Sequence, residues 1–193
     1  MEHDNLALDL LLDPTKTLLG REAVYDLVSS HVPAFVLVRR WRLHSREALE
    51  LAMRRVNEGW VGDGCAVAQY NILTSSELTY FFNRKLYLAV PPLIAKVDRD
   101  LESEVAHYLS LVGTAAKAPE IRDEFVRQGL HRDILDFANP FPNSLKVIGN
   151  LCYALSSLSF QKEQARADIV SRSAEISIIF ALMLKERTDR TII

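Results

Sequence analysis

Net charge, cysteine, glycine and proline are all low in this chain of 193 residues. It carries 23 basic and 25 acidic side chains, so nothing in the balance favours nucleic acid or an anionic membrane as a partner. The two cysteines, Cys65 and Cys152, lie in apolar stretches, and we expect buried, reduced thiols in a cytoplasmic protein. Only seven glycines and seven prolines occur, and no alternation of polar and apolar residues is sustained, which favours an all-α fold.

Signals for secretion and for membrane insertion are also missing. The N-terminus carries Glu2 and Asp4 where a secretory signal has basic residues. No uncharged stretch approaches the roughly 20 residues that a membrane-spanning helix needs. We therefore expect no membrane span.

Sequence patterns of common metal and catalytic sites are absent as well. The five histidines form no HExxH pattern, and no GxSxG nucleophile elbow occurs. The stretch GWVGDG at 59–64 lacks the spacing of a phosphate loop and predicts a turn. We expect no metal, no cofactor and no enzymatic activity, although a helical enzyme that uses His107 or His131 stays open as an alternative.

The stretch 104–139 predicts a helix, a short helix and a third helix. Apolar residues of the first helix, expected at about 104–117, recur at spacings of three and four, which places them on one buried face. Pro119 suits the first turn of the short helix, where its missing N–H is not needed. Gly129 is expected to end that helix in the left-handed conformation. In the last helix the residues expected to point inward are Leu130, Ile134, Leu135 and Phe137.

This block resembles an armadillo repeat. The family's pattern is a helix with an Asn-Leu-Ala-like step, a short helix ending in Gly, and a helix with paired apolar residues. Here Thr114-Ala115-Ala116, Gly129 and Ile134-Leu135 take these three places. The resemblance implies a superhelical stack of repeats.

Two further copies support the resemblance, at periods near ~40 residues that are typical of armadillo and HEAT solenoids. In the preceding copy, 65–98, Asn71-Ile72-Leu73 takes the first step, 75–86 is the short helix and 88–97 the long one. The following copy begins at 143, with Asn150-Leu151-Cys152 at the first step. Its short helix starts near 161 and is expected to turn Ala165, Ile169 and Val170 inward.

The N-terminal third predicts a more diverged repeat. A helix capped by Asn5 within 1–16 would seal the open end of the stack. Residues 17–30 and 31–41 echo the short-then-long helix pair, and Ser45 is expected to cap a strong helix over 45–59. We interpret 1–193 as one domain: an all-α, right-handed α-solenoid of about three to four degenerate armadillo-like repeats, with 1–16 as capping helix, 17–62 as diverged first repeat and 63–193 as clearer repeats.

Two charged clusters have simpler explanations than a ligand site. Four arginines, at 39, 40, 42 and 46, surround Trp41, and we interpret them as a solvated helix end and not as an RNA site. The acidic residues at 98, 100, 102 and 104 fit a helix N-terminus, where negative charge is favoured.

The C-terminal stretch 176–184 is more apolar than one helix face can bury. We predict that this helix packs on a partner or on a second copy of the chain, as a homodimer. A fragment of a longer solenoid would show the same pattern. Its apolar residues are Ile176, Ile178, Ile179, Phe180, Leu182, Met183 and Leu184.

In the armadillo family the Asn-containing helices line a concave groove, and the resemblance implies that a peptide or helix of a partner protein binds there. The implied ladder is Asn71, Thr114 and Asn150. The partner-binding candidates on and around it are Asn71, Thr74, His107, Ser110, Thr114, Lys117, Lys146, Asn150 and Tyr153.

Two qualifications belong to this site. No Trp stands a turn away from the ladder, so the cation clamp of nuclear-import armadillo proteins is missing its aromatic half. The amides of Asn71 and Asn150 could instead bridge helices inside the core. The function predicted is a non-catalytic scaffold or adaptor for protein–protein interaction, and the alternative is a homo-oligomerisation module that assembles through 176–184.

Overall fold

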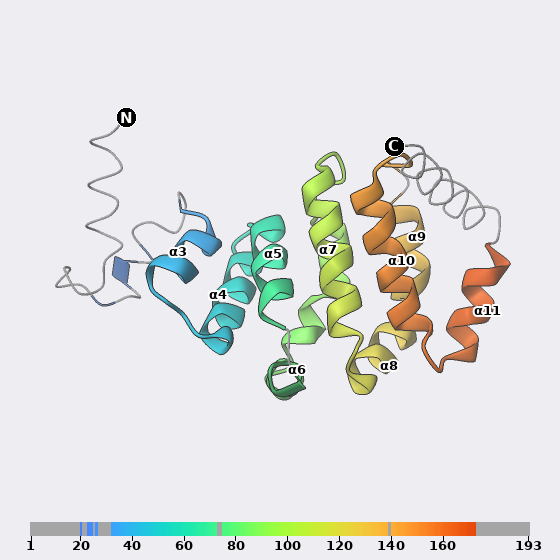
Figure 1. The fold of residues 1–193 in the computed structure, drawn as a ribbon, viewed down its shortest axis with the longest axis horizontal. Helices are drawn as coiled ribbons and strands as arrows, with labels where there is room; N and C mark the ends of the chain where they lie inside the picture. Colours follow the sequence, from blue (N-terminus) through green and yellow to red (C-terminus); the bar gives the residue numbers. More distant parts are fainter. Residues whose placement is uncertain are drawn as a thin grey trace, which may run out of the picture.

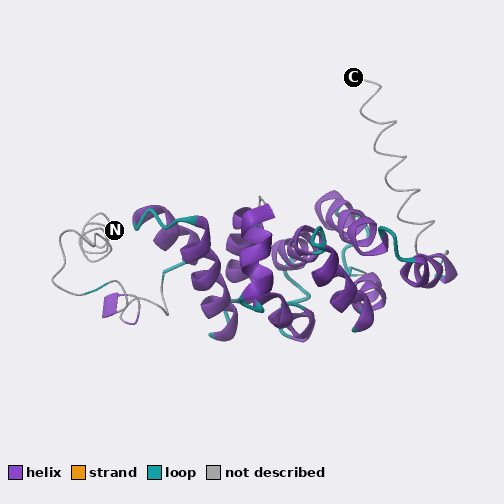
Figure 2. Cartoon of the chain, turned by 90° about the horizontal axis from the view of Figure 1, so that it is seen from below, coloured by secondary structure: helices purple, strands orange, loops and turns teal. Residues whose placement is uncertain are grey.

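The computed structural model describes residues 20, 23–24, 26, 32–72, 75–138 and 140–172 of the chain. Within these ranges the structure is all-helical and contains no strand. None of the helices described there is long and apolar enough to cross a membrane. Figure 1 shows the helices following one another along the long axis of the molecule in chain order, and the perpendicular view in Figure 2 shows the same elongated row.

The helical elements are short and separated by brief turns. In order they are α3 (Ala34–Arg40), α4 (Ser45–Asn57), α5 (Val61–Asn71), α6 (Ser75–Asn83), η1 (Leu86–Ala89), η2 (Pro91–Ala95), α7 (Glu102–Ala115), α8 (Pro119–Arg127), α9 (Leu130–Phe137), α10 (Leu145–Ser159) and α11 (Glu163–Ser171).

Four of these helices pack in succession. Helix α4 lies against α5, α5 against α7, and α7 against α10, and these are the most extensive helix–helix contacts among the described elements. Helices α8 and α9 contact α10, and α9 also contacts η2. The result is a row of long helices backed by shorter ones (Figure 1).

Helix α7 is the centre of this packing. Its residues from Val105 onward are buried except at two positions, His107 and Ser110. Tyr108 lies at its back, where its hydroxyl donates to the carbonyl of Val90 at 3.2 Å and its ring meets Phe137 edge-on at 5.2 Å. Apolar side chains on three sides of α7 therefore hold the front and back helices together.

The N-terminal end of the row is held by two side chains that come from later helices. The Asp63 carboxylate, on α5, accepts the backbone N–H of Ala34 at 2.6 Å, at the start of α3. The fully buried Arg55 guanidinium, on α4, donates to the carbonyl of Val32 and lies 4.8 Å from the centre of the Trp60 ring. Burial raises the pKa of the Asp63 carboxyl, and the Ala34 N–H and the Arg55 charge oppose that rise.

The prediction for the central block is confirmed. Helix α7 covers the first predicted helix within two residues at each end, and Pro119 is the first residue of α8. Gly129 separates α8 from α9 with φ at 81°, in the left-handed region that glycine adopts at little cost. The inward residues predicted for the last helix are all buried.

The long helix predicted over 88–97 is wrong. Two short 3-10 helices, η1 and η2, occupy this place. Pro91 and Pro92 provide no N–H groups for an α-helical turn, and proline also disfavours the helical conformation in the residue before it. Lys85, with φ at 54°, takes the left-handed position that precedes η1.

The turn predicted over 59–64 is also wrong in its second half, because α5 begins at Val61. The glycine at position 64 serves packing there. A Cβ at Gly64 would lie 2.6 Å from the carbonyl oxygen of Ala52 and 2.6 Å from the Cγ2 atom of Val56, so glycine allows α5 to approach α4.

Four smaller points concern single residues. Helix α4 is capped by His44 and not by Ser45, and the N–H of His44 donates to the Glu47 carboxylate at 3.1 Å. Val170 is 66% exposed although an inward position was predicted. Trp41 is only 5% exposed, so it belongs to the core, and Glu102 begins α7, as the acidic run predicted.

Several predictions lie outside the described residues. These are the capping helix in 1–16, most of the short helix in 17–30, the candidate Thr74, and the C-terminal stretch 176–184 with its proposed homodimer.

Gly113 is expected to set the distance between α7 and α10. A Cβ at this position would lie 2.5 Å from the Cδ1 atom of Tyr153 and 3.2 Å from the Cα atom of Ala154. Gly113→Ala should therefore lower the free energy of unfolding by about 1–3 kcal/mol through overpacking.

The matched control is Gly149→Ala, on the exposed side of α10, where an added Cβ meets nothing within 4 Å. It should raise stability by about 0.5–1 kcal/mol through helix propensity. Urea unfolding of both variants measures the difference, and equal effects of the two substitutions would contradict the packing argument.

Candidate functional site

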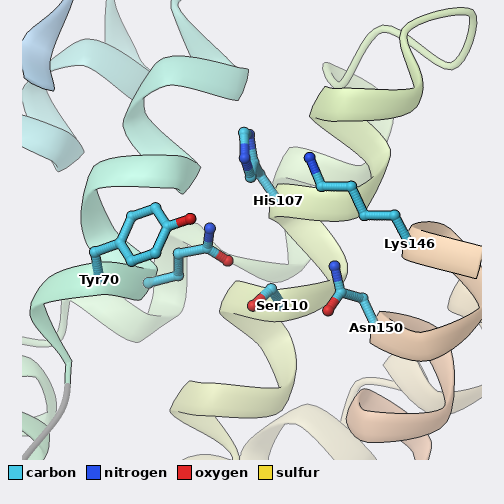
Figure 3. A pocket seen from close by; sticks show the side chains of 6 residues that line it. Tyr70, His107, Ser110, Lys146 and Asn150 are labelled. Carbon is cyan, nitrogen blue, oxygen red and sulfur yellow. The ribbon is translucent and has the colours of Figure 1, made fainter.

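An open hollow of about 300 Å³ lies where α5, α7 and α10 come together on one side of the row. We call it the central hollow. Each of the three helices contributes two side chains to it (Figure 3). The lining residues are Gln69, Tyr70, His107, Ser110, Lys146 and Asn150.

The floor of the central hollow is the one strip of α7 that its neighbours leave uncovered. His107 and Ser110 are three residues apart, so they lie on the same face of the helix. Both are half-buried, whereas the residues beside them in the sequence are fully buried. Figure 3 shows both side chains between Tyr70 on α5 and the two residues of α10.

Asn150 connects two walls of the central hollow. Its Nδ2 donates to the carbonyl of Ala106 at 2.9 Å, which links α10 to α7. This bond is the helix-bridging role that the sequence left open for the asparagines. Asn150 is nevertheless only half-buried and lines the hollow, so one amide both joins the helices and faces the open space.

Gln69 is the most buried polar residue of the lining, with 8% of its surface exposed. Its Oε1 is buried and has no hydrogen-bond partner in the part of the chain that the structure describes. A buried amide oxygen without a partner costs about 1–3 kcal/mol. The central hollow therefore contains an acceptor for which a bound group can supply the donor.

The charges of the lining are of one sign. Lys146 is exposed, and among the described lining residues there is no carboxylate. Burial lowers the pKa of the His107 imidazole, and the Lys146 ammonium lowers it further. His107 is therefore kept neutral to lower pH than an ordinary histidine.

Three other predicted site residues form a separate contact further along α7 and α10. The Thr114 and Tyr153 hydroxyls lie 3.4 Å apart, and the Lys117 ammonium lies 5.7 Å from the centre of the Tyr153 ring. Thr114 is buried beneath this ring. The structure therefore brings four of the nine candidates together in the central hollow and three in this second group.

Of the two remaining candidates, Asn71 does not line the central hollow. The Asn71 amide donates to the carbonyl of Val67, in its own helix, at 2.7 Å. Thr74 lies outside the described residues.

Gln69 and Tyr70 are the lining residues that the sequence argument missed. The armadillo pattern placed α5 in register through Asn71, but the helix presents the two residues before it to the hollow. A signal was available, since Gln69 is a polar residue that directly follows the apolar stretch 65–68. Interhelical rotation, which spacing within one helix does not encode, decides which of these positions faces α7.

The other histidine considered as a catalytic residue, His131, is part of a structural contact. It is buried on α9, and its Nε2 lies 2.9 Å from the Oδ2 atom of Asp168 on α11. Arg132 donates to the same oxygen through Nε at 2.9 Å. His131 and His107 thus lie on different helices, in different surroundings.

In the part of the chain that the structure describes, no three His, Cys, Asp or Glu side chains lie close enough together to bind a metal ion. Burial raises the pKa of the Cys65 thiol to about 12 and also raises that of Cys152, so neither is an activated thiolate. The chemistry that the central hollow offers is hydrogen bonding and a positive charge.

Comparison with known proteins finds no likeness for this chain: it matches no protein-family model, and no curated protein or solved structure is detectably similar to it.

The contact between α11 and α9 should depend on pH through Asp168. Hydrogen bonds from His131, Arg132 and Gln164 lower the pKa of this carboxyl to about 2. An unfolded Asp titrates near ~3.9, so the charged carboxylate stabilises the folded state above that pH, and this contribution is lost as pH falls toward the folded value.

Asp168→Asn removes the charge at every pH. The variant should therefore unfold at a lower denaturant concentration than the wild type at pH 7, and the gap should close as pH falls from about 4 to about 2. Parallel denaturant titrations across this range measure it. A gap that is constant with pH would show that the charge of Asp168 does not stabilise the fold.

Lys146 should control the titration of His107. Lys146→Met removes the repulsion, so the pKa of His107 should rise, while burial keeps it below the ordinary value of about 6.5. Because the folded-state pKa is lowered, His107 reduces stability as pH falls below the unfolded pKa, and Lys146→Met should lessen that loss.

NMR titration of the imidazole ring protons gives the pKa directly. Lys117→Met is the matched control, since Lys117 lies in the turn after α7, against Tyr153, and does not line the central hollow. An identical His107 pKa in the wild type and in both variants would contradict the electrostatic coupling.

Proposed function

We propose that the chain is an armadillo-like α-solenoid that acts as a non-catalytic scaffold or adaptor and binds a peptide or helix of a partner protein in the central hollow. The observation that carries this proposal is that three successive helices, α5, α7 and α10, each present two side chains to one open polar surface. Helical arrays form binding grooves in this way, with each of several neighbouring helices supplying side chains to one surface.

The packing order supports the solenoid part of the proposal. Helices α4, α5, α7 and α10 contact one another in this order, and α9 lies behind α10 (Figure 1). The unit formed by α7, α8 and α9 has the three consecutive helices that the armadillo resemblance implies, although α9, with 8 residues, is no longer than α8, with 9. The unit before it is irregular, since η1 and η2 stand where its last helix was expected.

The chemistry of the lining supports binding more than catalysis. The lining side chains of α5 and α10 donate and accept hydrogen bonds from fixed helical positions, which suits an extended peptide whose backbone has unpaired N–H and C=O groups. A nucleophile, a base and an orienting group in contact are what catalysis requires, and the described lining does not bring such a set together.

The test is selection of a random 12-residue peptide library against the purified chain, followed by affinity measurements on single peptides. The variant Ser110→Phe fills the floor of the central hollow. It should weaken the affinity for the selected peptides by at least about tenfold, which corresponds to about 1.4 kcal/mol of binding free energy. The matched control, Ser156→Phe, places the same ring on an exposed position of α10 outside the hollow and should leave affinity within about twofold.

Circular dichroism and thermal melting must first show that both variants keep the wild-type fold. Peptides that bind both variants equally well would place binding elsewhere. A failure to select any peptide, together with a mass that increases with protein concentration, would favour the homo-oligomerisation alternative instead.

A further inference from the structure

The buried oxygen of Gln69 and the ammonium of Lys146 favour two different groups on one ligand. Gln69 Oε1 is buried and unpartnered within the described chain, so it favours a ligand that brings an N–H group. Lys146 is an exposed ammonium that forms no salt bridge to a described residue, and it favours a ligand that brings an anion. A single ligand residue with a backbone N–H and an anionic side chain satisfies both.

Other lining groups favour an anion over a cation. Tyr70 and Ser110 carry hydroxyls that can donate to a carboxylate. The described lining contains no carboxylate that would repel an acidic group or attract a basic one. A basic side chain here would face the Lys146 ammonium without a counter-charge, and this repulsion selects against it.

The size of the central hollow sets the scale of the ligand. At about 300 Å³ it is at the lower end of pockets that take small molecules, and it is open to solvent. A hollow of this size accommodates one or two residues of an extended chain. It does not accommodate a folded surface.

We propose that the central hollow recognises an Asp or Glu residue within an extended peptide segment of a partner protein. The residue's backbone N–H donates to Gln69 Oε1, and its carboxylate accepts from the Lys146 ammonium and from the hydroxyls of Tyr70 and Ser110. This inference rests on the proposed function and adds the class of residue that the hollow selects.

The charge part is tested with the peptides selected from the random library. Selected sequences should be enriched in Asp and Glu, and replacing the acidic residue by Asn or Gln should weaken binding by about tenfold. Lys146→Glu should weaken the binding of acidic peptides by at least as much. The same variant should bind a peptide with Lys in place of the acidic residue more tightly than the wild type does.

Lys96→Glu is the control for net charge. Lys96 is exposed and does not line the central hollow, so the same charge reversal there should change affinity by less than about twofold. Equal losses in Lys146→Glu and Lys96→Glu would overturn the assignment of Lys146 as the recognition charge.

The hydrogen-bond part is tested by a double-mutant cycle. Methylating the backbone nitrogen of the acidic residue removes the N–H, and Gln69→Leu removes the acceptor with little change in volume. Each change alone should weaken binding by about three- to tenfold, and the two together should weaken it no more than one of them. Additive losses would overturn the contact.

A small carboxylate could present the same anion, and sodium glutarate serves as the probe. The proposal expects no displacement of a selected peptide at millimolar glutarate, and displacement at micromolar glutarate would overturn the peptide assignment. Peptides that depend on Ser110 but carry no acidic residue would overturn this inference and leave the proposed function standing. A library that yields no binding peptide would remove both.

Discussion

The burial of α7 on three sides is the constraint on which the rest of this structure depends. From Val105 onward, a helix in contact with α5, α10 and the short helices behind it leaves only a narrow strip partly open to water. The two residues on this part of the strip, His107 and Ser110, are polar. The central hollow is thus a direct result of how the array packs, because its floor is the part of the central helix that has no neighbour to cover it.

Packing and recognition are therefore not independent in this chain. The amide of Asn150 that faces the central hollow also fixes α10 to α7, and Gly113 lets the same two helices approach. Gln69 is held in a buried position by its helix although its oxygen has no partner among the described residues. Side chains positioned by rigid helices lose little conformational freedom on binding, so the hollow is largely preorganised for a ligand.

Local rules predicted the parts of the fold that local chemistry decides. Pro119 and Gly129 marked the start and end of α8 because the missing N–H of one and the left-handed backbone of the other each restrict a helix terminus. At Pro91 and Pro92 the likeness to a repeat pattern predicted a long α-helix, but two residues without N–H donors do not support one, and 3-10 helices form instead. Local rules failed at Gly64, since a glycine that permits close helix contact looks in sequence like one that makes a turn.

The candidate site divides in a similar way. His107 with Ser110, and Lys146 with Asn150, could be predicted because residues three or four apart share a face of one helix. Gln69 stands out in sequence only as a polar residue after an apolar stretch, because its place in the hollow depends on the rotation of α5 relative to α7. This rotation is set by contacts far apart in the sequence. Which residues share one helix face can be read from spacing, but which helix faces meet is a property of the packed array.

The contacts at the start of α3 have a consequence for the order in which the chain folds. A helix of seven residues is not stable alone in water, and this one has its first N–H accepted by Asp63, while Arg55 donates to the carbonyl of Val32, two residues before the helix begins. Both partners are made later than α3 during synthesis. Helix α3 therefore leaves the ribosome before α4 and α5 but acquires its stability only after they have docked, so assembly of this part of the array proceeds backward along the chain.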